Sequence, residues 1–158
     1  MCIKEDITFL NQLNSVKILK LKENATVPTR GTSGSAGYDL YACIDRKIII
    51  FHGDLVKIPC GIAIEIPENY AAFIFARSGL GVNHGIIPSN AVGVIDSDYR
   101  GEIQVGLCSV SKNCQYLVKN GDRIAQIIVM RKEVFKFEEV KSLSESGRCV
   151  NGFGSTGF

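Results

Sequence analysis

Residues 102–107 read Glu-Ile-Gln-Val-Gly-Leu, and this alternation of polar and apolar residues decides the fold class. Residues 62–66, Ile-Ala-Ile-Glu-Ile, follow a similar pattern. Successive side chains of a strand point to opposite faces, so a period of two predicts strands with unlike faces. No segment shows the pattern of a long amphipathic helix. The chain is therefore predicted to be an all-β protein.

Other apolar runs predict further strands at residues 16–21, 47–51, 70–75, 116–118, 124–130 and 134–140. Turn signals lie between them, such as Pro67-Glu68-Asn69 and Asn120-Gly121-Asp122. Short strands with closely spaced turns indicate a sandwich or a jelly-roll-like barrel. One short helical turn is expected at residues 78–83, with Ser78 as its cap.

The length of 158 residues suits a single domain with a proper core. We expect an N-terminal extension at residues 1–14, a β-barrel domain at 15–141 and a flexible tail at 142–158. The tail is rich in glycine and serine and has almost no strand pattern. It is either a mobile end without function or a segment that closes over a phosphorylated, aromatic ligand, because it carries Arg148 and Phe153.

Charge and cysteine content limit the partners and the compartment. The net charge is +2 without a block of lysines or arginines, so no nucleic-acid partner is expected. No apolar run approaches the roughly 20 residues of a membrane helix, and the N-terminus does not read as a signal peptide. The six cysteines form no C-x-x-C pair, which favours free thiols over a zinc site. We therefore expect no membrane partner and a reducing, cytoplasmic setting, with a nuclear location compatible with a eukaryotic source.

Residues 90–101 hold two carboxylates, a phenol and an arginine within five positions. If this segment were a strand, Asp96 and Asp98 would share a face. One interpretation is a polar hairpin that faces solvent. The other gives a carboxylate to a water molecule as general base and the ring of Tyr99 to a nucleoside.

Three other glycine-containing turns are candidate ligand sites. Residues 76–81, Ala-Arg-Ser-Gly-Leu-Gly, follow a predicted strand, and their backbone amides could hold phosphate oxygens beside Arg77 and Ser78. The turns at 34–40 and 121–126 carry Asp39 and Gln126. Each of the three also fits an ordinary turn between strands.

The order of these segments resembles the five motifs of the trimeric dUTPase family. The matching stretches are residues 36–40, 77–80, 93–101, 121–126 and 152–157, and the resemblance spans about residues 15–158. It implies hydrolysis of dUTP to dUMP and pyrophosphate, which keeps uracil out of DNA and supplies dUMP for dTTP synthesis. It also implies a distorted jelly roll of the β-clip type, a homotrimer with shared active sites, and a Mg²⁺ ion on the triphosphate.

The resemblance implies a role for each matching residue. Asp96 corresponds to the catalytic carboxylate, and Tyr99 to the ring beneath the deoxyribose. The implied uracil contacts are Asn90, Gly93, Val94, Ile95 and Gln104. The implied phosphate contacts are Arg77, Ser78, Gly79, Gln126 and Arg148. In the tail, which should close over the site, Phe153 and the following Gly154 correspond to the segment that covers the uracil. Asp39 corresponds to a carboxylate that is structural or reaches the metal through water.

The sequence departs from the family pattern at a few positions. Ala76 stands where a proline is usual, and Val82-Asn83 replace an often basic position. Cys149 and Asn151 replace two tail glycines, and cysteine tolerates left-handed backbone geometry poorly. We expect the tail to close nonetheless, with altered contacts to the γ-phosphate.

Two other functions are alternatives. A dCTP deaminase on a related fold should carry a glutamate as base and a different tyrosine motif, which residues 93–99 lack. A nucleotide sensor without activity should lack the acid, the ring or the tail, and all three are present. The sequence therefore favours the hydrolase.

Overall fold

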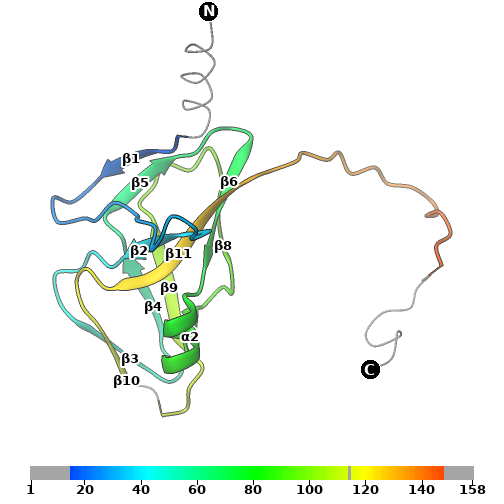
Figure 1. Ribbon diagram of the computed structural model, residues 1–158. Coiled ribbons are helices and arrows are strands. Elements are labelled where there is room, and N and C mark those ends of the chain that lie inside the picture. Colours follow the sequence, from blue (N-terminus) through cyan, green and yellow to red (C-terminus); the bar gives the residue numbers. More distant parts are fainter. Residues whose placement is uncertain (1–14, 114, 148–158) are drawn as a thin grey trace, which may run out of the picture.

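The computed structural model describes residues 15–113 and 115–147 (Figure 1). The strands in this part of the chain are β1 (Lys17–Lys20), β2 (Tyr38–Tyr41), β3 (Ile48–Phe51), β4 (Leu55–Pro59), β5 (Ile62–Glu65), β6 (Tyr70–Phe75), β7 (Ile86–Pro88), β8 (Gly93–Ile95), β9 (Gln104–Ser109), β10 (Gln115–Val118) and β11 (Arg123–Arg131). A single short helix, α2 (Ser78–His84), accompanies them in the same residues. The all-β prediction is confirmed.

The strands form four small antiparallel sheets. The largest has the order β2-β11-β6-β8, and a second has the order β4-β9-β7. Two-stranded pairs, β1 with β5 and β10 with β3, complete the body. Many neighbours in these sheets are distant in sequence, so the chain crosses repeatedly between them (Figure 1).

One hydrophobic core joins the sheets. Its fully buried large side chains come from seven strands and one loop: Leu40, Ile50, Ile58, Ile62, Ile86, Ile103, Leu107 and Ile124. The alternation predicted for residues 102–107 is confirmed, because Ile103, Val105 and Leu107 are buried while Gln104 is exposed. Strand β5 differs, since Ala63 is buried as well as Ile62 and Ile64. Both faces of β5 are therefore covered at this point.

Three predictions about local structure need correction. Residues 134–140 form no strand; they belong to an extended segment, residues 132–147, that leaves the body after β11 (Figure 1). Its apolar pattern resembles a strand, but a strand requires a partner, and no neighbouring strand within the described residues pairs with it. Ser78 is not a cap: Arg77 has the extended cap geometry without a side-chain cap, and Ser78 is the first helical residue. Asp96 and Asp98 do not share a strand face, because β8 ends at Ile95 and a turn follows.

Two glycines have positive φ for visible reasons. Gly85 ends helix α2 in the left-handed region, and its N–H donates to the carbonyl oxygen of Gly81 at 3.0 Å. Gly61 has φ +67°, and a side chain there would collide with Cys43 and Ala25. No helix in the described residues is long and apolar enough to cross a membrane.

Cys60, next to Gly61, titrates far from its ordinary range. Burial, together with the nearby charge of Glu102 and the Cys43 thiol, raises the pKa of Cys60 from 9.0 to about 12. Above pH 9 the unfolded thiol ionises while the folded thiol stays protonated, so this group favours unfolding increasingly from about pH 9 to about pH 12. The urea midpoint should therefore fall between pH 8.5 and pH 11 by more in the wild type than in Cys60→Ala. Equal alkaline slopes in the two proteins would contradict this assignment.

Candidate active site

Strand β8, the start of β9 and the loop between them form one side of a pocket of about 320 Å³. Its lining residues are Ile74, Asn90, Gly93, Val94, Ile95, Asp96, Tyr99, Glu102, Ile103 and Gln104. All predicted base, sugar and catalytic residues of the body are therefore in this one pocket. Its wall combines apolar side chains with backbone and side-chain polar groups, as small-ligand sites usually do.

The floor of this pocket follows from the pairing of β8 with β6. Gly93 is opposite Ile74 in the register, and a Cβ at position 93 would lie 3.2 Å from the Ile74 Cβ and 3.5 Å from the Asn90 Nδ2. A larger residue here would push against both lining groups. Gly93 thus keeps backbone, and no side chain, at this wall.

The approach to the pocket contains a strained residue. Ala91 has φ 61°, and the Val92 N–H donates to the Asn90 carbonyl oxygen at 2.7 Å across it. This three-residue turn is uncommon for a residue with a side chain and stores strain of about 1–3 kcal/mol. Such strain is frequent at ligand sites, and here it fixes the backbone of Asn90.

Asp96 and Tyr99 lie at the two ends of the turn that follows β8. The Tyr99 N–H donates to the Asp96 carbonyl oxygen at 3.2 Å, and the Tyr99 hydroxyl donates to the Glu102 carbonyl oxygen at 3.1 Å. A side chain at Gly101 would collide with the Tyr99 hydroxyl. Both ends of the tyrosine are thus held, while the residue remains 46% exposed and available to a ligand.

Glu102 connects the loop between β8 and β9 to the body. Its carboxylate accepts a hydrogen bond from the Gly61 N–H at 2.9 Å, in the link between β4 and β5. The sequence interpretation did not assign Glu102. Glu102 directly follows Gly101, and nothing in the sequence around it indicates that its hydrogen-bond partner is Gly61, 41 positions away.

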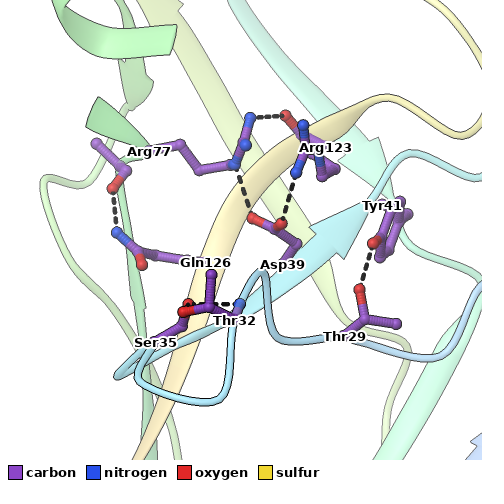
Figure 2. A network of polar contacts seen from close by, with 9 residues as sticks. Thr29, Thr32, Ser35, Asp39, Tyr41, Arg77, Arg123 and Gln126 are labelled. Atoms are coloured by element: carbon purple, nitrogen blue, oxygen red, sulfur yellow. Dashed lines mark hydrogen bonds and ion pairs between the residues drawn. The ribbon is translucent and has the colours of Figure 1, made fainter. Parts of the chain in front are cut away.

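A second cluster surrounds Asp39 (Figure 2). Arg77 Nε donates to Asp39 Oδ1 at 2.7 Å, and Arg123 Nη1 donates to Asp39 Oδ2 at 3.3 Å. Arg77 Nη1 also donates to the Arg123 carbonyl oxygen at 3.1 Å. Asp39 is 13% exposed, so one little-exposed carboxylate orients two guanidinium groups. A cation pair held this way is suited to bind an anion with several oxygens.

Gln126 and the start of α2 extend this second cluster. Gln126 Nε2 donates to the Ala76 carbonyl oxygen at 2.8 Å, beside Arg77 (Figure 2). Ser78 and Gly79 are exposed in the first turn of the helix, where N–H groups have no partner inside the helix. A Cβ at Gly79 would meet no atom within 4 Å. The surface at this turn is therefore open to a ligand.

Arg123 is the residue that the sequence interpretation missed in this cluster. It was part of the quoted stretch 121–126 but received no role. The pairing of β11 with β2, in which Gln126 is opposite Asp39, brings it to the carboxylate. Only a known strand register could have shown this.

The two clusters share no residue and lie toward opposite edges of the largest sheet. Asp39 belongs to β2 and the pocket wall to β8, with β11 and β6 between them. Three strand spacings amount to about 14 Å. Arg77 follows β6, but its guanidinium points to Asp39, away from the β8 edge. The tail residues Arg148, Phe153 and Gly154 lie outside the described residues.

Comparison with known proteins gives the family. The profile of the dUTPase family matches residues 23–157. The chain belongs to the dUTPase family. A deoxyuridine 5'-triphosphate nucleotidohydrolase from Desulfitobacterium hafniense is 43% identical over 150 residues, covering 92% of this chain and 99% of that protein. One from Anaplasma marginale is 44% identical over 144 residues, covering 90% of this chain and 97% of that protein.

Solved dUTPase structures share the fold at lower identity. A mutant of the dUTPase from Staphylococcus bacteriophage 80alpha superposes with a TM-score of 0.81 at 22% identity, covering 90% of this chain and 98% of that one. Another mutant of the same phage enzyme, in a structure with dUpNHpp, gives a TM-score of 0.79 at 23% identity, covering 92% and 99%. The jelly-roll-like fold expected for this dUTPase family member is confirmed.

The Asp39 cluster should contribute to folding as well as to the site. Asp39→Asn keeps the shape but removes the charge that faces two arginines, and we expect a loss of about 2 kcal/mol in the free energy of unfolding. The matched control is Glu65→Gln, which changes an exposed pair with Lys17 and should have a much smaller effect. Urea unfolding of both variants measures the difference. Equal losses would show that the arginines do not depend on Asp39.

Proposed function

We propose that this dUTPase family member hydrolyses dUTP to dUMP and pyrophosphate, with Asp96 activating the water that attacks the α-phosphate. The observation that carries the proposal is the pocket that joins Asn90, the β8 backbone, Asp96 and Tyr99, in a chain that matches the family over residues 23–157. The activity removes a precursor of uracil in DNA and supplies dUMP for dTTP synthesis.

The pocket supports selection of the base. Asn90, Gly93, Val94, Ile95 and Gln104 would meet the uracil edge, largely through backbone groups. Cytosine offers a different donor and acceptor pattern, which would leave these groups unpaired. Thymine adds one methyl group, and close packing such as that between Gly93 and Ile74 can reject it by collision.

Tyr99 supports selection of the sugar. Its ring is fixed by the hydrogen bond to Glu102 and by the space left at Gly101. A deoxyribose would pack on the exposed face of the ring. A 2′-hydroxyl would collide there, so a ribonucleotide should be a poor substrate.

The Asp39 cluster supports binding of the triphosphate. Arg77, Ser78, Gly79 and Gln126 would supply donors to the phosphate oxygens, with Arg123 as a further cation. Donors fixed before the reaction stabilise the charge that develops on the leaving pyrophosphate. Asp39, which orients Arg77 and Arg123, is on β2, three strand spacings or about 14 Å from β8 and the Asp96 pocket, so we assign the cluster to the site of another subunit.

A Mg²⁺ ion fits this arrangement as a companion of the triphosphate. The name of a solved dUTPase structure from phage phi11, with a TM-score of 0.72 and 20% identity, describes a structural Mg(II) ion in that protein. Mg²⁺ commonly binds phosphate oxygens and water with few protein ligands. Both Asp39 oxygens already accept hydrogen bonds from arginines, which favours a structural role for Asp39 or a link to the ion through water. The ion would neutralise charge on the phosphates.

Exposed apolar side chains support the homotrimer. Val134, Phe135, Phe137 and Leu143 are each at least 78% exposed on the segment after β11. A mostly apolar groove of about 460 Å³ lies between β1, β2, β5 and β11. Apolar surface of this extent usually marks an association site. In such a trimer, the tail (residues 142–158) would close over the active site of a neighbouring subunit.

An intracellular, cytoplasmic setting is part of the proposal. Cys43, Cys60 and Cys108 are free thiols in the described chain. Free cysteines are usual in reducing compartments.

The direct test is pyrophosphate release from dUTP with Mg²⁺, measured beside dCTP, dTTP and UTP. We expect release from dUTP alone. Ammonia released from dCTP would instead support a deaminase. Tight binding of dUTP without turnover would support a nucleotide sensor.

Replacing Asp96 by asparagine should separate binding from catalysis. The side chain keeps its shape but loses its basicity, so turnover should fall by about 10² or more while dUTP still binds. Single-turnover kinetics and equilibrium binding to the same preparation measure the two effects. Turnover at the wild-type level would remove Asp96 from the role of base.

Replacing Arg148 by alanine should test the tail. Loss of a charged hydrogen bond to the γ-phosphate predicts a decrease of about 10- to 100-fold in kcat/KM for dUTP. The control is Cys149→Gly, which restores the glycine usual in the family and should not reduce kcat/KM. Unchanged efficiency in Arg148→Ala would overturn the role given to this arginine.

A further inference from the structure

We propose that Lys132 is a positioning residue for the reaction, because its ammonium group holds the turn that carries Asp96. The inference rests on the proposed dUTP hydrolysis and adds a residue to it. Lys132 is outside all five motif stretches. Its position, directly after β11, gives no sequence sign of a link to residue 96.

The contact is a hydrogen bond from the end of β11 to the turn after β8. Lys132 Nζ donates to Ser97 Oγ at 2.9 Å, and both residues are partly buried. The Lys132 N–H donates to the Asn69 carbonyl oxygen at 2.9 Å, just before β6. The backbone of Lys132 is therefore fixed to the body. Its side chain in turn holds Ser97, the neighbour of Asp96, in place.

The other side-chain bonds of the turn do not fix it to the body in this way. Arg100 Nη1 donates to the Ser97 and Tyr99 carbonyl oxygens at 2.6 and 3.0 Å, so it stiffens the turn internally. The Tyr99 hydroxyl also bonds within the loop between β8 and β9, to the Glu102 carbonyl oxygen. Among the hydrogen bonds of the described residues, the one from Lys132 joins the turn 96–99 to a distant strand end.

The charged group of Lys132 lies beside the carboxylates around the turn that carries Asp96. Lys132, Asp96, Asp98, Glu65 and Glu68 border the same surface hollow. Arg100 borders this hollow as well, so two cations stand among four carboxylates and oppose the mutual repulsion of the carboxylates near the turn. Asp96 borders both this hollow and the substrate pocket, so a shift of the turn would move the base relative to the α-phosphate.

The test compares variants that remove the donor, keep it, or remove the acceptor. Lys132→Met deletes the ammonium but keeps a long side chain, Lys132→Arg keeps a cationic donor, and Ser97→Ala deletes the acceptor. Lys57→Met is the matched control: Lys57 is exposed on β4, and its side chain makes no hydrogen bond or ion pair in the described chain. For each protein kcat and KM for dUTP with Mg²⁺, oligomer size and thermal midpoint are measured.

We expect kcat to fall about tenfold in Lys132→Met, with KM and the thermal midpoint near wild type, since small displacements of a reacting group cost rate rather than folding. Lys132→Arg should recover most of kcat, and Lys57→Met should not change it. Ser97→Ala should lower kcat about as much as Lys132→Met does. The double variant should lower kcat no further, because both substitutions remove the same contact.

Three results would overturn the inference. The first is wild-type kcat in Lys132→Met, and the second is a loss in Lys132→Met that multiplies with the loss in Ser97→Ala. The third is a decrease in thermal midpoint that accounts for the lost activity, which would make the lysine merely structural. If Lys132→Met fails to fold, Ser97→Ala decides alone, since it keeps the lysine. An inactive wild-type protein would instead refute dUTP hydrolysis itself, so the two failures are distinguishable.

Discussion

Strand β6 is hydrogen-bonded on both sides, to β11 and to β8, and the arrangement of both clusters depends on these two pairings. On the β8 side, Ile74 meets Gly93 and closes the floor of the Asp96 pocket. On the β11 side, Phe75 meets Gln126, and the end of β6 delivers Ala76 and Arg77 to the Asp39 cluster. Strand β6 thus borders both the Asp96 pocket and the Asp39 cluster, and it separates the two.

This separation gives a physical argument for the active site that we propose is shared between subunits. A base that activates water and the donors that neutralise the leaving phosphates must act on one substrate, within a few ångströms of its reacting atoms. Within one chain a rigid sheet lies between Asp96 and Asp39. A second copy could bring its Asp39 cluster to the first copy's pocket without distortion of either. The hydrogen bond of Lys132 to Ser97 has a matching role in this proposal. It fixes the turn that carries Asp96 before a neighbouring subunit supplies the phosphate-binding arginines.

The sequence predicted the fold class and the contents of the pocket well, for a local reason. Alternation identified β9, and all lining residues of the pocket except Ile74 lie within residues 90–104, so most of their neighbourhood was already present in one short stretch of sequence. The same signals failed where partners are distant. Residues 134–140 have a strand's pattern, but no strand among residues 15–113 and 115–147 pairs with them, and the short strands β4, β7 and β8 had no assigned run. Arg123, Glu102 and Lys132 depend on register and on contacts across 35 or more positions, which no local pattern contains. The domain limits and the roles of Arg148 and Phe153 stay predictions.

The central claim, that Asp96 of one chain acts with Arg77 of another, has a direct measurement in mixed oligomers. Asp96→Asn and Arg77→Ala are purified separately, unfolded, mixed and refolded together, and pyrophosphate release from dUTP is compared with that of each variant refolded alone. A shared site predicts that mixtures regain a substantial fraction of wild-type activity, because some oligomers combine an intact Asp96 with an intact Arg77. Activity that never exceeds the sum of the two separate variants, although mixed oligomers form, would contradict it.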